Sequence, residues 1–109
     1  MRLSDENCHR IEKSEKPVQE EEAKRLVHEV PEWHLKDGTI EKDYRFGGFT
    51  EAIDFVNRVA DIAQSQDHHP DICVSYNKVH LELSTHKVGG LTRNDFILAA
   101  KIDTLGKPH

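Results

Sequence analysis

Apolar residues between Pro17 and Pro31 recur at the three- and four-residue spacing that is typical of an amphipathic helix. These residues are Ala23, Leu26, Val27 and Val30. The acidic run over residues 20–22 suits the first turn of this predicted helix, because carboxylates interact favourably with the positive end of the helix dipole. Pro31 is expected to end the helix.

Two later stretches have the same helical period. The longer one begins at Thr50, a favourable N-cap, and must end by about His69, because Pro70 disfavours helical geometry in the residue before it. Its apolar stripe consists of Ala52, Phe55, Val56, Val59, Ala60 and Ala63. The last helix follows Thr92-x-x-Asp95, which is typical of a capping box. It carries Phe96, Ile97, Ala99, Ala100 and Ile102.

Between the first two helices the period changes to the alternation of a β-strand. Trp33 and Leu35 alternate with polar residues and precede Asp37-Gly38, a strong signal for a hairpin turn. On the returning strand one face carries Ile40, Tyr44 and Phe46. We therefore expect an antiparallel hairpin here.

A second alternating segment predicts another hairpin after the long helix. Its apolar positions are Ile72, Val74 and Tyr76 on one strand and Val79, Leu81 and Leu83 on the next. Asn77-Lys78 is the expected turn, because asparagine tolerates positive φ. In this register, continuing the ladder places His69 opposite His86. We therefore expect His68, His69 and His86 to meet at one end of the sheet.

The predicted order of elements is α-β-β-α-β-β-α. Such an order indicates an α+β domain, with a four-stranded antiparallel sheet and the helices packed on one face. A chain of 109 residues has the length of one domain. Residues 1–16 are polar, mixed in charge and nearly free of apolar residues, so we expect a flexible segment there and a single domain over residues 17–109.

Charge and composition narrow the range of partners. The formal net charge is -5, and the basic residues form no stripe with interleaved aromatics, so nucleic acid is not expected as a ligand. Apolar runs are too short for a membrane span, and the N-terminus lacks the apolar stretch of a signal peptide. Cys8 and Cys73 form no CxxC pair, and we expect two reduced thiols in a cytoplasmic protein.

Three imidazoles that meet at one end of a sheet suit proton transfer near neutral pH, because histidine titrates in that range. Polar residues also collect at strand ends without any catalytic role, and the pattern alone leaves both interpretations open. Asp95 has an ordinary structural explanation as an acidic residue in the first turn of a helix.

A metal site is the competing functional interpretation, and the spacing argues against it. Adjacent histidines on extended backbone point to opposite faces, and no HxxxH or CxxC spacing occurs. Cys73 does not lie opposite His86 in the expected ladder, so a Cys/His nucleophilic pair is weak. His80 falls on the polar face of its strand and is expected to be solvated.

The spacing of these residues resembles the pattern of the pterin-4a-carbinolamine dehydratase family. That pattern begins with an acidic or related residue. Three residues later come three consecutive positions, which are His, then His or Asn, then Pro. An aromatic residue, another His and an Asp follow further along the chain. Here the matching residues are Gln64, His68, His69, Pro70, Tyr76, His86 and Asp95. The resemblance extends from about Pro17 to Ile102 and includes Trp33, "DHHPDI", "YNKVHLELSTH" and "GGLT".

Gln64 departs from the glutamate that many family members carry there. It lies four residues before His68, on the same face of the predicted helix. A carboxylate in this place could orient the imidazole, and a glutamine can still form a hydrogen bond without adding charge. We therefore expect Gln64 to orient His68.

The resemblance implies the dehydration of 4a-hydroxytetrahydrobiopterin (pterin-4a-carbinolamine) to quinonoid dihydropterin and water, in tetrahydrobiopterin recycling after aromatic amino-acid hydroxylation. It implies acid/base catalysis without cofactor or metal. His68 and His86 would be acid and base in an order left open, His69 would hold the pterin, and Asp95 would orient the site. A homodimer or homotetramer is implied as well.

The resemblance also supplies an alternative function. Some animal members bind a homeodomain transcription factor through a helical surface. A non-catalytic dimerisation or transcriptional coactivator module of the same fold is therefore the second hypothesis.

Overall fold

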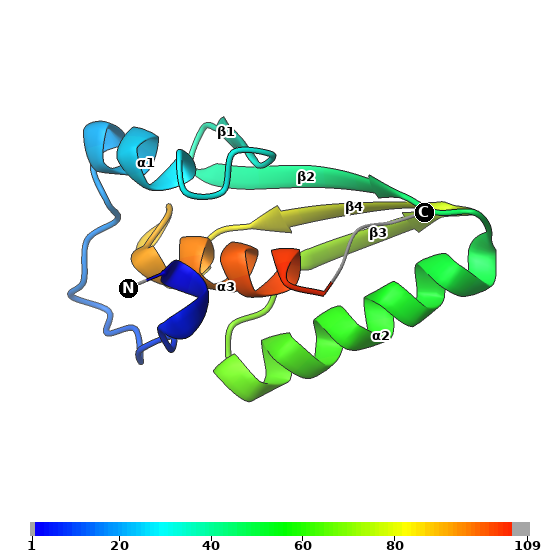
Figure 1. Ribbon diagram of the computed structural model, residues 1–109. Coiled ribbons are helices and arrows are strands. Elements are labelled where there is room, and N and C mark those ends of the chain that lie inside the picture. The colour runs from blue at the N-terminus through cyan, green and yellow to red at the C-terminus, as the bar shows by residue number, and fades with distance from the viewer. Residues whose placement is uncertain (1, 106–109) are drawn as a thin grey trace.

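The structure, a computed structural model, describes residues 2–105 of the chain. Its main elements follow the predicted order (Figure 1). They are α1 (Glu20–Val27), β1 (His34–Lys36), β2 (Thr39–Arg45), α2 (Phe49–Gln66), β3 (Asp71–Ser75), β4 (Lys78–Leu83) and α3 (Arg93–Asp103). Two short 3-10 helices, η1 (Leu3–Asp5) and η2 (His86–Val88), lie before α1 and after β4.

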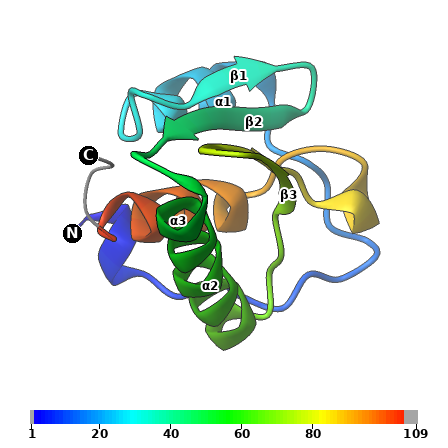
Figure 2. The same ribbon diagram turned by 90° about the vertical axis from the view of Figure 1, so that its right-hand side faces the viewer.

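The four strands form one antiparallel sheet in the order β1-β2-β4-β3. On β4 the residues at 79, 81 and 83 are buried, and the residues between them are partly exposed, because successive side chains of a strand point to opposite faces. α2 and α3 lie together on one side of the strands (Figure 2), and their apolar residues join those of β2 and β4 in one core. The predicted α+β fold is therefore confirmed.

The first hairpin forms as the sequence predicted. Lys36 pairs with Thr39, so the turn is Asp37-Gly38. Both turn residues have positive φ, 38° for Asp37 and 81° for Gly38, which is the geometry that matches the twist of a two-residue hairpin.

The second hairpin also forms, but its predicted register is wrong by two residues. Ser75 pairs with Lys78, so the turn is Tyr76-Asn77. Tyr76 takes the positive φ, 52°, that we had expected of Asn77. Asn77 instead holds the end of β2: its Nδ2 donates to the carbonyl of Phe46 at 3.0 Å, and its carbonyl accepts from the Phe46 N–H at 2.8 Å. A contact between the two hairpins therefore decides the register. A shift of two leaves the side chains that stay in the strands on their predicted faces, but it moves Tyr76 out of the strand and into the turn.

α1 is shorter than predicted, since it ends at Val27 and not at Pro31, whereas α2 and α3 lie close to their predicted positions. α1 begins three residues after Pro17, because the Val18 N–H donates to the carbonyl of Leu91 at 2.8 Å and holds the chain in a loop conformation. α2 begins at Phe49 and α3 begins with the expected capping box. None of the helices in residues 2–105 combines the length and the apolar composition that a membrane crossing requires.

The N-terminal segment lies against α3. Leu3 is only 2% exposed and belongs to the hydrophobic core, so the segment buries an apolar residue that its polar composition did not indicate. The Glu6 carboxylate accepts two hydrogen bonds from the Arg93 guanidinium, at 2.8 and 2.7 Å, and Lys101 donates to the carbonyl of Ser4. The contacts of Leu3, Ser4 and Glu6 favour a segment that is docked on α3. Flexibility of residues 1–16 and a domain boundary at residue 17 stay predictions.

We expect Leu3→Ala to lower the free energy of unfolding by about 2 kcal/mol, at the low end for buried leucine because η1 is a short element that can shift to fill the space. Arg2→Ala is the matched control, since Arg2 is exposed, and its effect should stay within about 0.5 kcal/mol. Urea unfolding followed by Trp33 fluorescence measures both. Equal midpoints for the two variants would support the flexible segment instead.

Candidate active site

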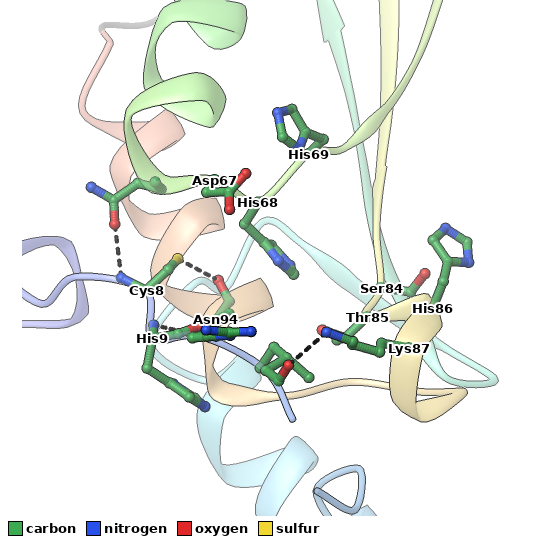
Figure 3. A pocket seen from close by; sticks show the side chains of 13 residues that line it. Cys8, His9, Asp67, His68, His69, Ser84, Thr85, His86, Lys87 and Asn94 are labelled. Carbon is green, nitrogen blue, oxygen red and sulfur yellow. Dashed lines mark hydrogen bonds between the residues drawn. The ribbon is translucent and has the colours of Figure 1, made fainter. Parts of the chain in front are cut away.

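A cavity of about 790 Å³ opens at the end of the sheet where α2 ends and α3 begins. Its lining comes from four parts of the chain that are far apart in sequence (Figure 3): residues 8–11, 66–69 and 84–87, and Asn94 in the first turn of α3. Both the imidazoles that the sequence singled out and the N-terminal segment therefore contribute to one concave surface.

His68, His69 and His86 all line this cavity. They do not meet through the predicted ladder, since pairing of β3 with β4 ends at Asp71 and His86 lies beyond β4 in η2. They meet because the segment after α2 and the segment after β4 reach the same end of the sheet (Figure 3). His68 is 8% exposed, whereas His69 and His86 are exposed at the opening.

The end of α2 turns His68 inward. Asp67 adopts left-handed geometry with φ 51° and ends the helix, and the His68 N–H donates to the carbonyl of Ala63 at 3.2 Å. His68 Nε2 then lies 2.6 Å from Asp95 Oδ1. A carboxylate can only accept, so Nε2 carries the proton of this hydrogen bond.

Asp95 is fully buried, and three donors satisfy its carboxylate. Besides His68, the Thr92 N–H donates to Oδ2 at 2.9 Å as part of the capping box, and the Thr85 hydroxyl donates to the same oxygen at 2.8 Å. A buried carboxylate that is fully hydrogen-bonded is held in one orientation. Asp95 thus both caps α3 and fixes the imidazole of His68.

The second ring nitrogen of His68 faces the cavity. Nδ1 has no hydrogen-bond partner within residues 2–105, and every buried side-chain nitrogen or oxygen in that part of the chain has one. Nδ1 must therefore be accessible. With the Nε2 proton engaged by Asp95, a neutral His68 presents the lone pair of Nδ1 to the cavity.

Gln64 contacts His69 and not His68, which corrects the sequence expectation. Gln64 Oε1 lies 3.1 Å from His69 Nε2. The four-residue spacing failed because α2 ends at Gln66 and the left-handed Asp67 takes His68 off the helical face. An orienting role for Gln64 stays a prediction, and the imidazole that it addresses is His69.

The family model described as pterin 4 alpha carbinolamine dehydratase matches residues 16–105. The chain belongs to the pterin-4-alpha-carbinolamine dehydratase family. A protein of Halorhodospira halophila, provisionally named pterin-4-alpha-carbinolamine dehydratase, is 41% identical over 108 residues, which cover 97% of this chain and 99% of that protein. One of Nitrosospira multiformis with the same provisional name is 44% identical over 103 residues, 94% of this chain and 91% of that protein.

Solved structures share the fold of this family member. The crystal structure of a transcriptional coactivator/pterin dehydratase from Brucella melitensis has a TM-score of 0.77 and 28% identity over 82% of this chain and 97% of that chain. A pterin dehydratase-like protein described as a RuBisCO assembly factor in the alpha-carboxysome has a TM-score of 0.57 and 20% identity over 71% of this chain and 89% of that chain, which shows a common fold alone.

One wall of the cavity comes from residues that the sequence analysis did not single out. The His9 N–H donates to Asn94 Oδ1 at 3.0 Å, and Asn94 Nδ2 donates to the His9 carbonyl at 2.7 Å. Lys87 Nζ donates to the carbonyl of Ile11 at 2.9 Å across the opening. Residues 8–11 have no period or motif that could have indicated this position.

Tyr76, which belongs to the family pattern, is 68% exposed at the β3–β4 turn and does not line the cavity.

We expect Thr85→Val to destabilise the fold by about 2 kcal/mol, because the side-chain shape is kept and the buried Asp95 carboxylate loses one of its donors. Thr50→Val is the matched control, since Thr50 is exposed in the first turn of α2. Urea denaturation of the two variants gives the difference. Identical stabilities would mean that Thr85 does not support Asp95.

The two thiols should differ in reactivity. Burial, and secondarily the nearby Asp95, raises the pKa of the Cys8 thiol to about 11, and its Sγ contacts the carbonyl of Asn94. Because the thiolate is the nucleophile, iodoacetamide should label the exposed Cys73 near neutral pH and leave Cys8 largely unmodified. Labelling of Cys8 should accelerate as the pH rises towards that pKa. Mass spectrometry of Cys73→Ser and Cys8→Ser proteins tests this, and equal neutral-pH rates would contradict it.

Proposed function

We propose that this protein dehydrates 4a-hydroxytetrahydrobiopterin (pterin-4a-carbinolamine) to quinonoid dihydropterin and water by histidine acid/base catalysis. The observation that carries the proposal is the His68–Asp95 pair at the inner surface of a cavity that His69 and His86 also line. Membership of the family supplies the reaction class, and the cavity volume is in the usual range for a small-molecule site.

The reaction needs an acid and a base in one site. The bond from C4a to the hydroxyl breaks, a proton joins the hydroxyl as water leaves, and a ring N–H gives up a proton. One proton is donated and one is accepted, so no redox partner or metal is required for the balance. Two imidazoles that face the same ligand can supply both transfers.

The hydrogen bond that His68 donates to Asp95 favours His68 as the base. It keeps the Nε2–H tautomer, which leaves the Nδ1 lone pair for the substrate proton, and the carboxylate then stabilises the imidazolium that forms. His86 would be the acid, since its exposed ring can exchange protons with water. His69, with Gln64 beside it, would hold the pterin at the opening.

A cytoplasmic location and assembly as a homodimer or homotetramer belong to the same proposal, as the family resemblance implies. Sedimentation equilibrium of the purified protein tests the assembly.

The decisive test is a stopped-flow assay with enzymatically generated 4a-hydroxytetrahydrobiopterin. We expect His68→Ala and His86→Ala each to lower kcat by about 10²–10⁴-fold, the usual contribution of a positioned acid or base, and the double variant to remove the acceleration. Asp95→Asn should lower kcat while His68 is retained, because the imidazole loses its fixed tautomer. His28→Ala is the control, since His28 is exposed at the end of α1, and its rate should equal that of the wild type.

A folded wild-type protein that gives no acceleration would contradict the proposal. It would favour the alternative of a non-catalytic dimerisation or transcriptional coactivator module. The Brucella melitensis relative is described as a transcriptional coactivator/pterin dehydratase. Circular dichroism of each variant separates loss of the fold from loss of chemistry.

A further inference from the structure

The sheet face opposite the core carries a histidine that is surrounded by three carboxylates. His80 lies on β4, and its Nδ1 is 2.6 Å from Asp43 Oδ1 on β2. Its Nε2 is 3.3 Å from Glu82 Oε1 and 3.7 Å from Glu41 Oε2. None of these four residues lines the cavity described above, so this cluster is separate from the candidate active site.

Two carboxylates of this cluster, Glu41 and Glu82, lie in a row of like charge together with Asp71. Glu41 on β2 pairs directly with Glu82 on β4, and Glu82 pairs on its other side with Asp71 on β3. Like charges in directly opposed positions destabilise a sheet. Within residues 2–105, the only ion-pair partner of Glu41 and of Glu82 is His80. A cation bound between the two glutamates would remove this repulsion.

The spacing of the glutamate oxygens around His80 suits a tetrahedral zinc ion. Glu41, His80 and Glu82 each offer one ligand atom, and these three atoms lie within 4.8 Å of one another. Zinc bonds of about 2.0–2.2 Å to nitrogen and oxygen place neighbouring tetrahedral ligands about 3.4 Å apart. The two distances from His80 Nε2, 3.3 and 3.7 Å, are close to that value. Three protein ligands leave the fourth position for water.

Asp43 completes the arrangement from the other side of the ring. An imidazole that binds metal through one nitrogen donates the N–H of the other, most often to a carboxylate or a backbone carbonyl. The contact between His80 Nδ1 and Asp43 Oδ1 has this form, and it leaves Nε2 directed at the two glutamates.

We propose that Glu41, His80 and Glu82 bind one Zn²⁺ on this face of the sheet, with Asp43 as the positioning residue. The ion joins β2 to β4 and neutralises the opposed glutamates. The proposal departs from the sequence expectation of no metal, which rested on the absence of a linear ligand motif. These ligands come from two strands, and only the pairing of β2 with β4 brings them together.

The test is isothermal titration calorimetry of the metal-free, full-length protein with zinc chloride in a weakly coordinating buffer. We expect one Zn²⁺ per chain, no such binding in His80→Ala, and affinities at least about tenfold lower in Glu41→Gln and Glu82→Gln. Asp43→Asn should weaken binding by about 10–100-fold, the usual effect of losing such a partner. Zinc should also raise the melting temperature of the wild type and not that of Glu41→Gln.

Two control variants locate the ion. The His68→Ala, His86→Ala double variant removes the imidazoles of the cavity, and Cys73→Ser removes the thiol that pairs with His80 across β3 and β4. Both should bind zinc as the wild type does. Absence of stoichiometric zinc binding in the wild type would overturn the proposal. Zinc binding that is kept in Glu41→Gln but lost in either control variant would also overturn it, because the ion would then lie elsewhere.

Discussion

The hydrogen bond between His68 and Asp95 connects segments that the chain otherwise leaves apart. Asp95 is buried as a carboxylate, and a buried charge is costly unless donors surround it. The donors come from the segment after α2, the segment after β4 and the N-cap residue of α3. Satisfying one carboxylate therefore fixes three segments at one end of the sheet, and the cavity takes its shape from those segments.

The opposite end of the core depends on a second well-satisfied carboxylate. Asp103, at the end of α3, accepts hydrogen bonds from the indole N–H of Trp33, from Lys42 and from the hydroxyl of Tyr44. Burial, together with the Asp103 charge, raises the pKa of Tyr44, so this tyrosine remains a donor. α3 is thus held by a carboxylate near each end, and the one at its N-terminus binds His68, which lines the cavity.

The two faces of the sheet handle charge differently. On the core side Asp95 and Asp103 are each matched by three donors. On the other face Glu41 and Glu82 lie opposite each other, and both have His80 as their ion-pair partner. The hydrogen bond between His80 and Asp43 raises the pKa of the His80 imidazole and lowers the pKa of the Asp43 carboxyl. The cavity around His68 therefore lies beside a buried carboxylate that is fully hydrogen-bonded, and the proposed zinc site lies where carboxylates crowd one another on the outer face.

Periodicity, capping residues and turn signals determined the order of elements, the face on which each strand residue lies and the capping of α3, because these features depend on neighbours within a few residues. The spacing of the residues from Gln64 to Asp95, with the motifs around them, sufficed to indicate the family. Tertiary contacts decided the rest. The contact between Phe46 and Asn77 fixed the register of the second hairpin. Because α2 ends in left-handed geometry, Gln64 contacts His69. The N-terminal wall of the cavity and the cluster around His80 join residues from separate elements. Their positions follow from packing and strand pairing, which no local pattern in the sequence records.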